Sequence, residues 1–123
     1  MEPGTPAYNL PRAIRIAGRL NTVALAQALQ QIIDRHESLR TTFISEEGEP
    51  RQVIQLEVRL ELAETDLADL SEQERTNEVL RLIREDAAKG FDLSTGPLIR
   101  FRLIRLEPEV HVLVLVVHHI ITD

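Results

Sequence analysis

The residues best suited to chemistry lie at the C-terminal end of the chain, where His118 and His119 are closely followed by Asp123. An imidazole titrates near neutrality, so it can accept and return a proton at physiological pH. Neighbouring side chains of a strand point to opposite faces, so the two rings should not converge on one atom. This disfavours a zinc site, which needs three or four converging ligands. We expect one ring to pack inward and the other to face a cleft; the alternative is a histidine pair without chemistry.

A second group of ionisable and hydroxyl side chains occupies residues 35–43 (RHESLRTTF), at a predicted junction of helix and strand. An Arg of this stretch could hold a carboxylate such as Asp123 through a bidentate pair. The alternative is a helix C-terminus that carries favourable positive charge. A third segment, residues 92–97 (DLSTGP), has Pro after its Gly and no Lys, which indicates a turn and not a phosphate-binding loop.

Hydrophobic periodicity predicts the elements that position these residues. Strands are expected at residues 13–20, 39–45, 51–56, 58–62, 98–106 and 110–118, with a hairpin turn at 46–49. Helices are expected from Asn21 or Thr22 to about His36 and from Ser71 to about Lys89. The buried stripes are predicted to be Leu25, Leu29, Ile32 and His36 with Ala28 beside them, and Val79, Leu80, Ile83 and Ala87.

Local signals mark the ends of the second helix, and one strand is unusually apolar. Ser71 and Glu74 have the spacing of a capping box, and Gly90 is the expected residue after the helix end. Residues 110–118 are apolar at nearly every position, which is typical of a central strand covered on both faces. These patterns predict an α/β fold with a mixed, largely antiparallel sheet and two main helices.

Composition excludes several classes of function. The 123 residues fit one domain or lobe, and there is no cysteine for a disulfide or thiolate site. The net charge is −6, and Arg100, Arg102 and Arg105 are scattered over both faces of a strand, which argues against nucleic-acid binding. The N-terminus is no signal peptide, and residues 112–117, the longest apolar run, are too short to cross a membrane. A cytoplasmic location is the expectation.

Four motifs, in this order, resemble the condensation domains of nonribosomal peptide synthetases. Residues 8–11 (YNLP) look like the opening segment of that family, and residues 35–43 match the pattern RHExLRTxF. Residues 91–98 contain FDL and GPL, like the helix-to-strand loop of the family. Residues 118–123 match HHxxxD, the first six positions of HHxxxDG.

The resemblance implies a chloramphenicol acetyltransferase-like half-domain, a two-layer sandwich. Residues 1–123 would be part of the N-terminal lobe, truncated within HHxxxDG because the Gly is absent. The whole domain would be an acyltransferase-type enzyme that forms amide bonds between carrier-protein-bound aminoacyl or peptidyl thioesters. No cofactor is expected to bind directly, since substrates arrive on phosphopantetheine arms. The expected partners are carrier proteins, the second lobe and adjacent synthetase domains.

The resemblance also assigns roles to residues. His119 corresponds to the catalytic histidine, and His118 to a structural one. Asp123 corresponds to a motif Asp that pairs with an Arg, for which Arg40 is the candidate and Arg35 the substitute. The chain alone is expected to be inactive and prone to self-association. The alternatives are an epimerisation-type domain or a non-catalytic docking module for carrier proteins or neighbouring domains.

Overall fold

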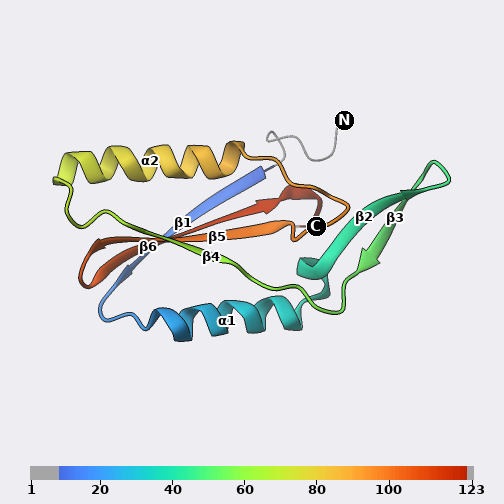
Figure 1. The fold of residues 1–123 in the computed structure, drawn as a ribbon, viewed down its shortest axis with the longest axis horizontal. Coiled ribbons are helices and arrows are strands. Elements are labelled where there is room, and N and C mark those ends of the chain that lie inside the picture. The colour runs from blue at the N-terminus through green and yellow to red at the C-terminus, as the bar shows by residue number, and fades with distance from the viewer. Residues whose placement is uncertain (1–8, 122–123) are drawn as a thin grey trace.

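The computed structural model of the protein describes residues 9–121. Tyr8 and Asp123, which belong to the first and last motifs, lie outside this range. The elements, in chain order (Figure 1), are β1 (Asn9–Ala17), α1 (Thr22–Arg35), the 3-10 helix η2 (Glu37–Arg40), β2 (Thr41–Glu46), β3 (Glu49–Ile54), β4 (Leu62–Asp66), α2 (Glu72–Ala88), β5 (Ile99–Glu107), β6 (Val110–His118) and the 3-10 helix η3 (His119–Ile121). No helix among these is both long and apolar enough to cross a membrane.

Four strands form the main sheet in the order β1-β6-β5-β4. The central strand β6 pairs antiparallel with β1 and β5, whereas β4 pairs parallel with β5. The expected mixed, largely antiparallel sheet is therefore confirmed. The register places Asn9 opposite His118, so the start of β1 lies beside the candidate site at the end of β6.

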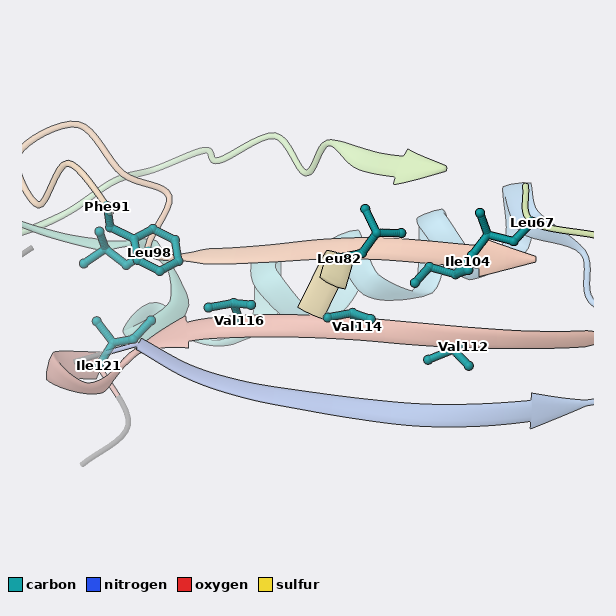
Figure 2. Close-up of a cluster of buried hydrophobic side chains, with 9 residues drawn as sticks. All are labelled: Leu67, Leu82, Phe91, Leu98, Ile104, Val112, Val114, Val116 and Ile121. Carbon is teal, nitrogen blue, oxygen red and sulfur yellow. The ribbon is translucent and has the colours of Figure 1, made fainter. Parts of the chain in front are cut away.

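The two long helices lie on opposite faces of the main sheet (Figure 1). On the α1 side, Leu29 and Ile33 pack with Phe101 and Leu113 of the sheet. Figure 2 shows the cluster on the α2 side, formed by Leu67, Leu82, Phe91, Leu98, Ile104, Val112, Val114, Val116 and Ile121. The α/β class is confirmed, but the layers number three instead of two. Periodicity shows which residues are apolar and does not show which face of the sheet each helix covers.

Each of the two predicted buried stripes of the helices includes at least one residue that is exposed. In α1, Ile33 is buried while Ile32 is 46% exposed, and His36 is the exposed C-cap residue. In α2, Leu82 is buried while Leu80 is 46% exposed. Apolar residues flank both sides of each stripe, so packing against the sheet selects the buried one. The capping box is confirmed, since Ser71 accepts from the Glu74 N–H and the Glu74 carboxylate from the Ser71 N–H.

The starts of β1 and β2 also differ from the predicted ones. β1 begins at Asn9, before Pro11, because an edge strand tolerates a proline in its register. β2 begins at Thr41, because residues 37–40 form η2. The hairpin of β2 and β3 is confirmed, and its two-residue turn has positive φ at Glu47 and Gly48, as a type I′ turn requires.

The short strand expected at residues 58–62 is wrong, because β4 begins only at Leu62. The backbone of the expected strand bonds instead to a side chain of α1. The Gln30 amide donates to the Val58 carbonyl at 2.7 Å, and its oxygen accepts from the Leu60 N–H at 2.8 Å. A helix side chain thus replaces the neighbouring strand that the alternation of Val58 and Leu60 suggests.

An ion pair joins β5 to α2. Arg102 donates from Nε and Nη2 to the two carboxylate oxygens of Asp86, at 2.7 and 2.9 Å, and from Nη1 to the Thr65 hydroxyl at 2.9 Å. The two charged side chains are only 20% and 16% exposed, and the hydrogen bonds to Asp86 raise the pKa of Arg102. The pair fixes the C-terminal half of α2 on the sheet.

Candidate active site

His118 is the last residue of β6, and its side chain is buried. It is 2% exposed, and its backbone N–H donates to the Leu98 carbonyl at 2.9 Å. The ring Nδ1 accepts a hydrogen bond from the Ile120 N–H at 3.1 Å. An accepting Nδ1 carries no proton, so the ring is neutral with its proton on Nε2. His118 thereby fixes the first turn of the chain beyond the strand.

His119 begins η3 and is exposed. The strand ends one residue before it, so the strict alternation of a strand does not extend to this position. One ring is buried and the other exposed, as expected, because the chain turns at η3; that the exposed ring faces a cleft stays a prediction. The apolar anchor of the turn is Ile121, which is 8% exposed and belongs to the α2-side cluster. Figure 2 shows Ile121 at the end of that cluster with Phe91 and Leu98.

Burial lowers the pKa of His118, and a positive charge on the neighbouring His119 lowers it further. The folded chain therefore binds a proton on His118 less readily than the unfolded chain, whose histidine pKa is about 6.5. The free energy of unfolding should be greatest above about pH 7 and fall as the pH drops through about 6.5 toward the lowered pKa.

We expect the variant His118→Asn to lose this pH dependence. Asn cannot titrate, and its Oδ1 keeps an acceptor near the position of Nδ1. Urea denaturation of both proteins between about pH 7 and 5 measures the difference, in a window above the titration of the carboxylates. Equal pH slopes for the wild type and the variant would show that His118 titrates normally.

Arg40 and Arg35 occupy different environments. Arg40 ends η2 and is partly buried; its Nε donates to the Ile33 carbonyl at 3.2 Å and its Nη1 to the Gln55 carbonyl at 2.6 Å. These bonds tie the end of α1 to the chain that follows β3. Arg35 is the exposed last residue of α1. Asp123 lies outside the described residues, so its pairing with either Arg stays a prediction.

The segment of residues 92–97, expected as a turn, follows Phe91, whose motif was recognised in the sequence without a contact to the candidate site. The ring of Phe91 meets the His118 ring edge to face, with centroids 6.1 Å apart and planes at 79°. The Phe43 N–H donates to the Leu93 carbonyl at 2.7 Å, which joins the loop to β2. Gly96 is required here, because its φ is +59° and a Cβ would lie 2.9 Å from the Thr42 methyl. The loop therefore connects the RHExLRTxF stretch to His118.

The chemistry available at this site is that of an exposed imidazole on a fixed turn. Among residues 9–121, no three His, Asp or Glu side chains lie close enough together to hold a metal ion. His119 can exchange a proton with an incoming group, while the buried ring of His118 supports the turn that carries it.

Three comparisons place this arrangement among known proteins. The family described as "Condensation domain" matches residues 1–123. A linear gramicidin synthase of Brevibacillus parabrevis is 45% identical over 121 residues, which cover 98% of this chain and 2% of that protein. Phosphinothricin tripeptide synthetase PhsC of Streptomyces viridochromogenes is 43% identical over 123 residues, which cover 100% of this chain and 11% of that protein.

Solved structures agree with the sequence relatives. The SgcC5 protein of Streptomyces globisporus aligns with a TM-score of 0.86 and 34% identity, over 97% of this chain and 27% of that one. The starter condensation domain of rhizomide synthetase RzmA aligns with a TM-score of 0.84 and 26% identity, over 98% of this chain and 30% of that one. The chain belongs to the condensation-domain family and has the chloramphenicol acetyltransferase-like fold of its members. It spans only a small part of each relative.

Proposed function

We propose that this chain forms part of a domain that joins two carrier-protein-bound aminoacyl or peptidyl groups by an amide bond. The observation that carries the proposal is the pair of histidines on one turn, His118 buried and accepting the Ile120 N–H, and His119 exposed. Membership of the condensation-domain family supports the reaction class. The relatives named as a linear gramicidin synthase and a tripeptide synthetase support the choice of thioester substrates.

In the proposed reaction, the nitrogen of the acceptor amine bonds to the carbonyl carbon of the donor thioester. The carbon–sulfur bond breaks, and the thiol of the donor's phosphopantetheine arm leaves with a proton that the amine has lost. His119 either takes this proton or orients the amine and stabilises the tetrahedral intermediate; both roles are open. The phosphopantetheine belongs to the carrier proteins, so the domain itself needs no bound cofactor.

The remaining residues are proposed as supports of this site. Asp123 would brace the end of the motif through an Arg, with Arg40 as the candidate and Arg35 as the substitute. Two hydrogen-bonding nitrogens of Arg40 already bond to the carbonyls of Ile33 and Gln55, so Nη2 is the group with most freedom to meet a carboxylate. His118 would hold η3. Carrier proteins and neighbouring synthetase domains are the proposed partners.

The test uses a complete condensation domain that contains this chain, mixed with two carrier proteins loaded with different aminoacyl groups. Mass spectrometry of the arms should detect a dipeptidyl thioester on the acceptor carrier. Binding without product would overturn the proposal in favour of a docking module. Inversion of the aminoacyl α-carbon without amide formation would overturn it in favour of an epimerisation-type domain.

The 123-residue chain forms a second arm of the same experiment. We propose that it makes no product alone, because it corresponds to only 27% of the SgcC5 chain. Light scattering should show self-association, since Ile14, Ile54 and Leu56 are 50%, 48% and 97% exposed. A cytoplasmic location stays a prediction from the sequence.

A further inference from the structure

The guanidinium of Arg100, a residue of β5, forms hydrogen bonds with backbone carbonyls at the C-terminal end of α2. Its Nη1 donates to the Gly90 carbonyl at 3.1 Å, and its Nη2 donates to the carbonyls of Asp86, at 2.7 Å, and Lys89. The last carbonyls of a helix have no partner within the helix and carry partial negative charge, so a cation that reaches several of them is favourable. Arg100 thus fixes the place where α2 passes into the Phe91 loop.

The face of the same guanidinium lies on Phe91. The Cζ of Arg100 is 3.9 Å from the centre of the Phe91 ring, within the range of a cation–π contact. Phe91 is 8% exposed, and its ring also contacts the His118 ring. Within the described residues, the buried Arg100 Nε has no acceptor, so stacking and the carbonyls set the plane of the group. Arg100, Phe91 and His118 therefore form a continuous chain of contacts.

A second contact holds the helix end from the β1 side. The Asn9 amide donates to the carbonyls of Ala87, at 3.0 Å, and Lys89, at 2.8 Å. Asn9 is also the residue opposite His118 in the register of β1 and β6. The end of α2 is thereby anchored by the two strands that flank β6, close to the residue that precedes the turn of His119.

We propose that Arg100 and Phe91 are positioning residues for the amide-forming site, acting on His119 through His118. This inference rests on the proposed function. If Arg100 is removed, Phe91 loses the cation stacked on its ring, and the His118 ring that contacts Phe91 gains room to move. Because the Nδ1 of His118 accepts the Ile120 N–H, movement of that ring shifts η3 and the imidazole that η3 carries.

The variants Arg100→Met and Phe91→Leu test this chain of contacts in a complete condensation domain that contains it. Each should lower kcat for amide formation roughly ten-fold, since small misplacements of reacting groups cost one to two orders of magnitude. KM for the acceptor carrier should change less than about two-fold, because Phe91 is buried and the partly buried guanidinium of Arg100 is already bonded to the end of α2. The double variant should be no worse than about the poorer single one, because both act through one path.

Arg102→Met is the matched control. It removes an Arg from the same strand that also bonds to α2, but Arg102 bonds to Asp86 and Thr65 and does not stack on Phe91. At a temperature where all variants are folded by circular dichroism, its kcat should stay within about two-fold of wild type. Equal losses of kcat in Arg100→Met and Arg102→Met would overturn the proposal, because stability alone would then explain them.

Nuclear magnetic resonance of ¹⁵N-labelled histidine provides a readout besides activity. In the wild type, His118 should show one neutral tautomer with the proton on Nε2. Arg100→Met and Phe91→Leu should shift it to a mixture of both tautomers, and Arg102→Met should not. An unchanged His118 spectrum in Arg100→Met would contradict the positioning role of Arg100. Failure of the wild-type domain to make amide, with the spectral changes as expected, would instead reject the proposed function alone.

Discussion

Replacing His119 with alanine in a complete condensation domain that contains this chain should lower the rate of amide formation by about 10²–10⁴-fold, the usual contribution of a general acid–base group. His119 is exposed at the start of η3, so its loss leaves no cavity in the core. The free energy of unfolding should consequently stay close to that of the wild type. Transfer between two loaded carrier proteins, followed by mass spectrometry, measures the effect.

Two further variants sharpen this result. His119→Gln keeps a hydrogen-bonding side chain but removes the base, so partial activity with a flat pH profile would favour amine positioning over proton abstraction. Gln27→Ala, an exposed substitution on α1 outside the candidate site, should retain the wild-type rate. If His119→Ala also works within about three-fold of wild type, general acid–base chemistry by this residue is rejected.

Asp86→Ala should lower the free energy of unfolding by about 3 kcal/mol, because it leaves the Arg102 guanidinium largely buried without its counter-charge. Urea denaturation of this chain, followed by circular dichroism, measures the loss. The effect should exceed that of breaking the pair of Arg81 and Glu85, because both of these side chains are more than half exposed and water screens their charges.

The double variant Asp86→Leu with Arg102→Met provides the control for this prediction. It removes both charges and fills the space with apolar groups, so much of the lost stability should return. A loss in Asp86→Ala no greater than that in Glu85→Ala would show that water screens the Arg102 pair. A double variant as unstable as Asp86→Ala would show that shape, and not unpaired charge, governs this contact.

The sequence predicted well what local chemistry decides. The capping box of Ser71 and Glu74 and the boundaries of β6 were correct because they depend on neighbouring residues. The choice of Ile33 over Ile32 was missed because it depends on which residues of the sheet meet α1. The parallel pairing of β4 with β5 was missed for the same reason, since it joins segments that are distant in the chain.

Only part of the candidate site could be predicted from the sequence. The histidine pair was found from its residue type, and the different burial of its rings was expected. The contact of Phe91 with His118 was not found, because nothing in a single Phe before a turn distinguishes it from a core residue. Arg100 was interpreted only as part of a scattered basic group. Its hydrogen bonds to the end of α2 arise from tertiary packing, which leaves no periodic signal.

The strand order has a consequence for how the chain reaches its native state. Within residues 9–121, β1 pairs only with β6, so Asn9–Ala17 cannot pair until Val110–His118 is present. Such distant pairing carries a high entropic cost and slows folding. During synthesis the edge of β1 stays unpaired until almost all of these residues have been made, while β5 and β6 can pair as a local hairpin. The strand that ends at His118 is therefore also the one that completes the sheet.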